Sequence, residues 1–269
     1  MMRNFIYLVI LSAALTACGT SYNIVGKSNM ASLDGQKLYL TVFQDTAMQR
    51  IDSCEIVHGG FLMSGSVDSV MMAFIVDEGN MMPVVLEEGT VDILLDAARN
   101  KVTGTDLNER LYNFLAEYAD IQGQINGLVR EHDQAIMNGD DLQEVTPRLQ
   151  KKGVMLNQQL DKKVTSFIKD NYDNVLGPGV FFLVTMNNPY PVHTPWIDAI
   201  MITATKNFKN DPYVKQYIDA ANQNQAIMAG QEPSKPAQDT PQNSADQTNA
   251  AVAAPPTPNQ LAGQDSIKD

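Results

Sequence analysis

The sequence contains few of the residues that build reactive or metal-binding sites. It has only two cysteines, Cys18 and Cys54, which excludes both the disulfide framework of a small secreted domain and a Cys-based zinc site. Its three histidines, His58, His132 and His193, fall in a turn, on a helix face and in a Pro-rich stretch. No two of them share metal-ligand spacing, so we interpret them as surface residues and expect no metal and no cofactor.

Positive charge is also scarce. The chain has 19 Lys and Arg against 31 Asp and Glu, a formal net charge of -12. Nucleic-acid binding requires cations for the phosphates, so we expect no nucleic-acid partner. Because 44% of the 269 residues are hydrophobic, the chain can nevertheless bury a sizeable core.

The apolar run at the N-terminus, residues 5–15, is too short for a membrane span, which needs roughly 20 residues. With Arg3 before it, the run has the length of a signal-peptide hydrophobic region, and we predict a signal peptide over residues 1–17. The alternative interpretation is a buried cytoplasmic helix that contains an incidental cysteine.

The stretch Leu15-Thr16-Ala17-Cys18 resembles the lipobox of bacterial lipoproteins. This resemblance implies that Cys18 is acylated and becomes the new N-terminus, with residues 18–21 as a tether. Several acyl chains on one residue give stable anchoring, so the membrane is an expected partner. Gly19 follows the cysteine and no acidic residue precedes Asp34. By resemblance to known sorting rules, this favours the outer membrane and its periplasmic leaflet.

Residues 22–104 are rich in strand patterns. Apolar residues alternate in short segments, with Leu38, Leu40 and Val42 on one face of the first. His58-Gly59-Gly60 supplies the positive-φ residues of a predicted hairpin turn. Six or seven short strands without intervening helices predict an antiparallel sandwich or small barrel. The named segments are 37–44, 50–57, 61–67, 70–76, 84–87 and 90–95.

Several short sequence motifs in this region resemble those of domain of unknown function 4369. They are Leu38-Tyr39-Leu40; Ile51-Asp52-Ser53 followed by Gly60-Phe61 and Gly65; Val85-Leu86-Glu87-Glu88-Gly89; and Val102-Thr103-Gly104-Thr105-Asp106-Leu107-Asn108. The resemblance covers residues 22–114 and continues more weakly to Met228. It implies an envelope lipoprotein of Gram-negative bacteria, in which this domain precedes a thioredoxin-like (AhpC-TSA) domain. The family has no established activity.

Residues 105–228 predict a helical segment. Apolar residues recur every three or four positions from Leu107 to Leu128, and Thr105 or Asp106 can cap this helix with Glu109 in capping-box spacing. Residues 138–141 break the pattern before a second helix over 149–168. The two helices predict an antiparallel hairpin.

Glycine and proline residues divide the rest of the helical segment. Gly177-Pro178-Gly179 predicts a break before Val180–Val184, which by itself fits either a strand or a short helix; the family resemblance favours a helix. Thr194-Pro195 and Asp211-Pro212 each predict an N-cap followed by a proline in the first helical turn.

Residues 229–269 form a tail rich in Gln, Ala, Pro, Asn, Ser and Thr, which predicts disorder. In the lipoproteins that the chain resembles, a Trp-Cys-x-x-Cys motif would begin near here. The chain has no Cys after Cys54 and no Trp after Trp196. We therefore expect no thioredoxin-like domain in this chain.

The sequence contains no catalytic constellation. Ser64 lies in Met63-Ser64-Gly65-Ser66, which lacks the Gly-x-Ser-x-Gly elbow of a nucleophile. The pairs Glu87-Glu88 and Asp140-Asp141 lie beside turns, so we interpret them as capping or solvated groups rather than as an acid/base pair or a calcium site. Met71-Met72 and Met81-Met82 fit an adaptable contact surface, although core filling is the simpler interpretation.

Two further hypotheses concern modification and redox chemistry. Cys54 is either a redox thiol or a small buried residue, and the second is favoured because free cysteine is commonly buried. Three Asp-Ser/Thr-apolar triplets resemble the O-glycosylation acceptor of some bacterial envelope proteins, with Thr46, Ser69 and Ser266 as the acceptors.

These observations predict a lipid-anchored, periplasm-facing envelope protein that is not an enzyme and that binds or scaffolds another envelope protein. The alternative is an accessory to envelope thiol-disulfide chemistry, with Cys54 as its reactive residue. An enzymatic role would require the fold to gather polar residues that sequence spacing does not reveal.

Overall fold

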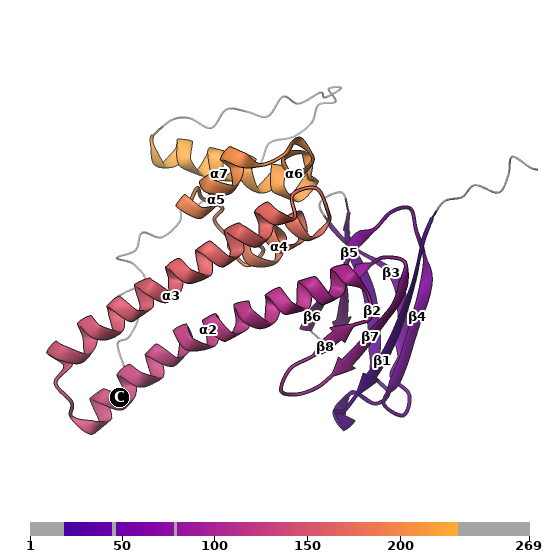
Figure 1. Ribbon diagram of the computed structural model, residues 1–269, viewed down its shortest axis with the longest axis horizontal. Helices are drawn as coiled ribbons and strands as arrows, with labels where there is room; N and C mark the ends of the chain where they lie inside the picture. The colour runs from indigo at the N-terminus through magenta and orange to yellow at the C-terminus, as the bar shows by residue number, and fades with distance from the viewer. Residues whose placement is uncertain (1–18, 45–46, 78–79, 231–269) are drawn as a thin grey trace, which may run out of the picture. The chain divides into compact units, whose positions relative to one another are not determined.

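The computed structural model describes residues 19–44, 47–77 and 80–230 (Figure 1). The predicted signal peptide, Cys18, Thr46, Ser266 and residues 231–269 of the predicted tail lie outside the described residues. The described part has eight strands followed by helices, which confirms the predicted α+β class. None of its helices is long and apolar enough to cross a membrane.

Two separate four-stranded sheets form the N-terminal part, in the orders β4-β1-β7-β8 and β3-β2-β5-β6. This arrangement is the sandwich rather than the small barrel. The strands are β1 (Thr20–Ser28), β2 (Lys37–Gln44), β3 (Ala47–Glu55), β4 (Gly60–Val67), β5 (Met71–Asp77), β6 (Asn80–Leu86), β7 (Gly89–Leu95) and β8 (Lys101–Thr103), and the short helix η1 (Ala31–Leu33) follows β1.

Strand β1 begins two residues before the predicted start of the sandwich and matches none of the segments named from the sequence. It pairs antiparallel with β4 but parallel with β7, so the sandwich is antiparallel-rich rather than wholly antiparallel. Parallel neighbours require a long crossover connection. The chain from β2 to β6, which contains the whole second sheet as well as β4, supplies that connection between β1 and β7.

The predicted hairpin between residues 50–57 and 61–67 is wrong. His58 (φ 51°) and Gly59 (φ 73°) do adopt the predicted positive-φ conformation. However, β3 pairs with β2 and β4 pairs with β1, so the turn carries the chain from one sheet to the other. Only a single bridge, Val57 with Gly60, links the two sides of the turn. The turn residues determine the reversal, but long-range strand pairing determines which sheet receives β4.

The helical part begins with the predicted antiparallel hairpin of α2 and α3. Gly139 ends α2 in the left-handed conformation (φ 74°), and Asp141 caps α3 by accepting a hydrogen bond from the Gln143 N–H. The helices are α2 (Asp106–Asn138), α3 (Leu142–Asp170), α4 (Leu176–Thr185), α5 (Pro195–Thr203), α6 (Lys206–Asn210) and α7 (Pro212–Met228). Thr194 and Asp211 cap α5 and α7 as predicted; α6 is not predicted.

The predicted break at Gly177-Pro178-Gly179 is also wrong, because these residues lie inside α4. Pro178 is tolerated because it occupies the first turn, where a backbone N–H has no helical partner. The run 180–184 is helical, as the family resemblance implies.

Two large apolar cores organise the described part, and a smaller cluster of Ile121, Leu156 and Leu160 lies between α2 and α3. The first fills the space between the sheets and includes Ile24, Leu40 and Val84, each 0% exposed. The second joins the helices to one another and includes Val85 of β6 together with Leu111 and Phe181. Successive residues of β6 therefore belong to different cores, because side chains alternate across a strand.

Candidate functional site

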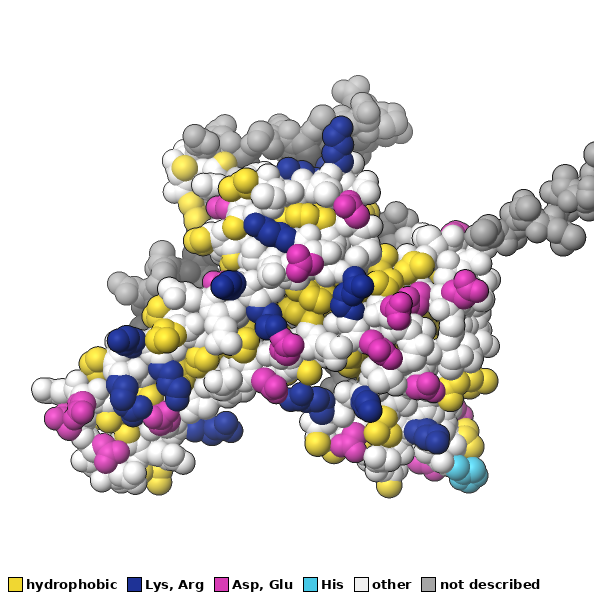
Figure 2. All heavy atoms as spheres, in the orientation of Figure 1, with side chains coloured by type: hydrophobic (Ala, Val, Ile, Leu, Met, Phe, Trp, Pro, Cys, Tyr) yellow, Lys and Arg dark blue, Asp and Glu magenta, His cyan; other side chains and the backbone are white. Residues whose placement is uncertain are grey.

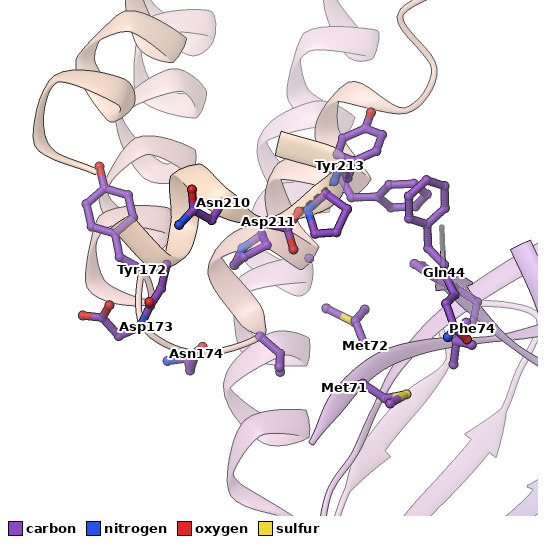
Figure 3. A pocket seen from close by; sticks show the side chains of 18 residues that line it. Gln44, Met71, Met72, Phe74, Tyr172, Asp173, Asn174, Asn210, Asp211 and Tyr213 are labelled. Atoms are coloured by element: carbon purple, nitrogen blue, oxygen red, sulfur yellow. Dashed lines mark hydrogen bonds between the residues drawn. The ribbon is translucent and has the colours of Figure 1, made fainter. Parts of the chain in front are cut away.

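An open cleft of about 660 Å³ lies where the end of β2 and the start of β5 face α4 and the start of α7 (Figure 3). Hydrophobic side chains gather at the surface where the helices meet the sandwich (Figure 2). The lining residues are Val42, Phe43, Gln44, Met71, Met72, Phe74, Tyr172, Asp173, Asn174, Val175, Pro178, Gly179, Phe182, Asn207, Asn210, Asp211, Pro212 and Tyr213.

Aromatic rings form much of the cleft wall. The Phe182 ring lies 5.4 Å from the rings of both Phe43 and Phe74, and 4.7 Å from the ring of Tyr213, between ring centroids. These offset and edge-on arrangements are the favourable geometries for aromatic pairs. The wall therefore connects two strands with two helices through directly packed rings.

Met72 crosses from the sheet to α4. A Cβ atom built on Gly179 would lie 2.2 Å from the Met72 Cε, so a glycine at this position lets the methionine pack on the helix backbone. Met72 is only partly buried and faces the open space in Figure 3. A flexible thioether in this position can adjust to the shape of a bound group.

The rim of the cleft is polar. The side chains of Gln44, Asp173, Asn207 and Asn210 are exposed, and among the described residues they form no side-chain hydrogen bond or ion pair. Asn174 differs because its Oδ1 accepts a hydrogen bond from the Leu176 N–H at the start of α4. The rim amides can each donate and accept hydrogen bonds with a bound molecule.

Asp211 is the carboxylate nearest the centre of the cleft in Figure 3. Its Oδ1 accepts hydrogen bonds from the backbone N–H groups of Tyr213 (3.0 Å) and Val214 (3.1 Å). Burial raises its pKa, and the two hydrogen bonds oppose that shift by favouring the charged form. Asp211 is thus accounted for as the N-cap of α7.

The tyrosine hydroxyl groups of the cleft are already bonded within the protein. The Tyr213 hydroxyl lies 2.9 Å from the Thr185 Oγ1, and the Tyr172 hydroxyl donates to the Ile200 carbonyl at 2.7 Å. Burial raises the pKa of both tyrosines. Among the described residues, the lining contains no Ser, Thr, Cys, His, Lys or Arg side chain. Its chemistry is suited to binding.

A second cleft, of about 700 Å³, lies between β6, β8 and α2. It contains Arg99, whose guanidinium is paired with Asp120 at 2.7 Å, and Tyr112, whose hydroxyl donates to the Pro83 carbonyl at 3.1 Å. Burial strongly raises the pKa of Tyr112. The polar groups at this cleft therefore hold α2 against the edge of the sandwich.

The methionines singled out in the sequence have different surroundings. Met71 and Met72 line the first cleft, and each is also partly buried, Met71 against the sandwich core and Met72 against the helical core. Met81 and Met82 both line the second cleft, and Met82, which is 8% exposed, also belongs to the sandwich core. Hydrophobicity alone does not distinguish these four positions, because the burial of each methionine depends on which element packs over its strand.

Cys54 is half-buried on β3 and packs beside the sandwich core. Burial raises the pKa of its thiol; the Leu62 backbone N–H opposes this shift and the Asp52 charge adds to it. Since the thiolate is the reactive form, this environment lowers reactivity. Ser69 lies exposed in the connection between β4 and β5, and Ser64 lies exposed on β4.

His193 has a structural role that its sequence position does not suggest. Its Nδ1 lies 2.8 Å from Asp198 of α5, and its Nε2 lies 2.9 Å from the Asn222 side-chain oxygen of α7. These two hydrogen bonds raise its pKa. His58 is exposed in its turn. No group of three or more His, Cys, Asp or Glu side chains among the described residues is arranged to hold a metal ion.

One residue of each acidic pair, Glu87 and Asp141, acts as a cap, in agreement with the sequence interpretation. Glu87 accepts hydrogen bonds from the backbone N–H groups of Leu107 (3.0 Å) and Asn108 (3.2 Å), so it caps α2 from the connection between β6 and β7. The predicted capping box within α2 is wrong, because Glu109 accepts from the Gly104 N–H instead. A residue distant in sequence has taken the capping position.

The fold and its cleft define an α+β protein with a two-sheet sandwich and an attached helical part. Residues 22–111 match the family model described as Domain of unknown function (DUF4369), which confirms the predicted resemblance over this range. The match extends from β1 into the first turns of α2. No curated protein and no solved structure matches the chain.

Proposed function

We propose that this protein is a lipid-anchored component of the cell envelope that faces the periplasm and binds another envelope protein through the cleft beside α4. In this proposal it performs no catalysis. The observation that carries it is the cleft itself: an apolar, aromatic wall, a partly buried methionine and a rim of amide groups that have no partner among the described residues. These are the features of a recognition site rather than of a reaction centre.

The position of β1 supports a short connection to the membrane. Thr20 already belongs to β1 and pairs with Val67 at the end of β4. Only Gly19 separates Thr20 from Cys18, so acyl chains on Cys18 would hold this end of the sandwich within about 7 Å of the modified residue. Met71 follows Val67 after three residues. The cleft would therefore open near the membrane surface.

Anchoring is tested by feeding the native host an alkyne analogue of palmitate and measuring label on the purified protein. We expect label on the wild type, a mature chain beginning at Cys18, and release of a Cys18→Ala variant from the membrane. A labelled Cys18→Ala variant, or a mature protein beginning at Met1, would contradict lipidation at this residue.

Binding through the cleft is tested with a photoreactive amino acid in the native envelope. At Asn210, on the cleft rim, we expect crosslinking to a defined protein. Asn126, which is exposed on α2, provides a matched control position and should give no such adduct. Identical adducts from both positions, or none from Asn210, would refute the cleft as the binding site.

The alternative role in thiol-disulfide chemistry rests on Cys54 alone. The raised pKa and half-buried position of this thiol weaken it, because little thiolate is available for attack. The decisive measurement is a search for mixed disulfides in the native envelope. A partner that is lost on Cys54→Ser would favour this alternative over simple binding.

O-glycosylation remains a separate proposal. Ser69 is exposed between two strands, as an acceptor must be. Thr46 and Ser266 are the other two proposed acceptors. Intact-mass and peptide mass measurements on protein from the native host would reveal the glycan at each position, and unmodified peptides at all three would dispose of the proposal.

A further inference from the structure

The cleft beside α4 carries negative charge without positive charge. Its lining includes two carboxylates, Asp173 and Asp211, and among the described residues it includes no Lys, Arg or His. No basic side chain of the described part lies within ion-pair distance of either carboxylate. The rest of the lining consists of glycine and of apolar, aromatic and amide side chains. The electrostatic complement of this lining is a cation.

Asp211 has one carboxylate oxygen that the fold does not use. Its Oδ1 accepts both capping hydrogen bonds, from the N–H groups of Tyr213 and Val214. Its Oδ2 forms no hydrogen bond and no ion pair with a described residue. One oxygen is enough to cap α7, so the other can accept a hydrogen bond from a bound group.

The surroundings of Asp211 disfavour a charge that has no counterion. Burial is the largest cause of its raised pKa, and no charged side chain contributes to the shift. A partly buried carboxylate in this situation loses hydration without gaining an ion pair. A cation that entered the cleft would supply the missing interaction.

The wall beside Asp211 matches the apolar stem of a basic side chain. The Tyr213 ring lies 4.7 Å from the Phe182 ring and 5.7 Å from the Phe43 ring, between centroids. Aromatic faces attract cations, and the methylene groups of Lys and Arg pack on apolar surface. Met72 adds an apolar contact of adaptable shape. The amide oxygens of the rim can accept further hydrogen bonds from a cationic group.

These features select among the groups that a protein partner could insert. An apolar side chain would cover the Asp211 Oδ2 and leave it unpaired, and an acidic side chain would be repelled by it. A Lys or Arg side chain can pair with Oδ2 while its methylene groups contact the rings. The wall and the carboxylate thus favour the same occupant.

We propose that the partner inserts a Lys or Arg side chain into this cleft, with its charged end at the Asp211 Oδ2 and its stem on the Phe182 and Tyr213 rings. This inference rests on the proposed function, because it specifies the chemistry by which the cleft recognises its partner. The net charge of -12 would attract a basic segment at long range, and Asp211 would fix where its basic side chain docks.

The test removes the charge of Asp211 and keeps its cap, in the full-length chain. Asp211→Asn retains an oxygen for the two backbone N–H groups, because Asn and Asp are equally good N-caps. Asp211→Ser is a second uncharged N-cap and should behave in the same way. Asp219→Asn is the matched control, since Asp219 is exposed on the same helix, about 12 Å further along its axis, and does not line the cleft.

The readout is the adduct formed in the native envelope by the photoreactive amino acid at Asn210. Its yield should fall about tenfold with Asp211→Asn and stay unchanged with Asp219→Asn, because only the first change removes a charge-assisted hydrogen bond to the partner. The crosslinked segment of the partner should contain a Lys or Arg. Replacement of that residue by Gln should lower the yield as much as Asp211→Asn does.

The outcomes distinguish this inference from the function on which it rests. A full yield with Asp211→Asn and Asp211→Ser, or a crosslinked segment without Lys or Arg, would overturn the basic side chain and leave binding through the cleft intact. Equal losses with Asp211→Asn and Asp219→Asn would indicate an effect of net charge alone and would also overturn it. The absence of any adduct from Asn210 in the otherwise wild-type chain would overturn the proposed binding and this inference together.

Discussion

Asn108 is the residue at which we expect a single substitution to be most destabilising. Its side chain is 0% exposed in the first turn of α2. It accepts from the Val85 N–H at 2.9 Å, donates to the Val85 carbonyl at 2.8 Å and donates to the Thr105 Oγ1 at 2.9 Å. Val85 is also 0% exposed, so water does not replace these bonds without rearrangement.

The change Asn108→Ala leaves two buried backbone groups of Val85 without partners. Each such group costs about 1–3 kcal/mol. Alanine recovers a few tenths of a kcal/mol through its higher helix propensity. We therefore expect the free energy of unfolding to fall by about 2–5 kcal/mol. Because Asn108 also attaches α2 to β6, the loss should affect the sandwich and the helices together.

Urea unfolding measures this loss through two signals. Far-UV circular dichroism reports on both parts of the chain, and the fluorescence of Trp196 reports on the helical core. Asn113→Ala is the control, since Asn113 lies exposed on the same helix without a side-chain hydrogen bond among the described residues. If Asn108→Ala changes stability by no more than Asn113→Ala, the strand-mimicking role of Asn108 is refuted.

Three further outcomes follow from the site. The pKa of His193 is raised above 6.5, so its hydrogen bonds to Asp198 and α7 should stabilise the fold fully below pH 6.5. This stabilisation should be lost as the pH rises through the raised pKa. The variant His193→Gln should remove this pH dependence from urea midpoints measured between about pH 5.5 and 8.5. Gly179→Val should cost about 1–3 kcal/mol, measured by urea unfolding, because its side chain displaces Met72, and a loss below about 0.5 would contradict that contact. Cys54 should react with iodoacetamide more slowly than a free cysteine at pH 8, and an equal rate would show an accessible thiolate.

Local patterns predict strand β2 and the caps of α5 and α7. The segment 37–44 coincides with β2 at both ends, since its alternating residues are buried on one face and its composition favours strand. The prolines after Thr194 and Asp211 mark the starts of α5 and α7. In each case the determinant is within a few residues of the element it specifies.

Features that depend on contacts between distant residues cannot be predicted from the local sequence pattern. The turn at His58 and Gly59 has the expected backbone conformation, yet it joins two sheets instead of two neighbouring strands. Gly179 looks like a helix breaker until Met72, more than a hundred residues earlier, packs against it. The cleft combines residues 42–74 with residues 172–213, so no local spacing indicates it.

The family match includes one wall of the cleft and ends before the other. Residues 22–111 include Met72 and Phe74 on the sheet side, whereas Phe182 and Tyr213 on the helix side lie beyond the match. The same range includes Asn108, whose bonds to Val85 fix where α2 leaves the sandwich. The direction of α2, and through it the placement of α3 and α4, therefore depends on a junction within the matched domain. A chain with the same sandwich and junction but different residues on α4 and α7 would keep one wall of the cleft and change the other. On this reasoning a change in α4 or α7 would alter the helix wall of the cleft and leave in place the wall that the matched domain supplies.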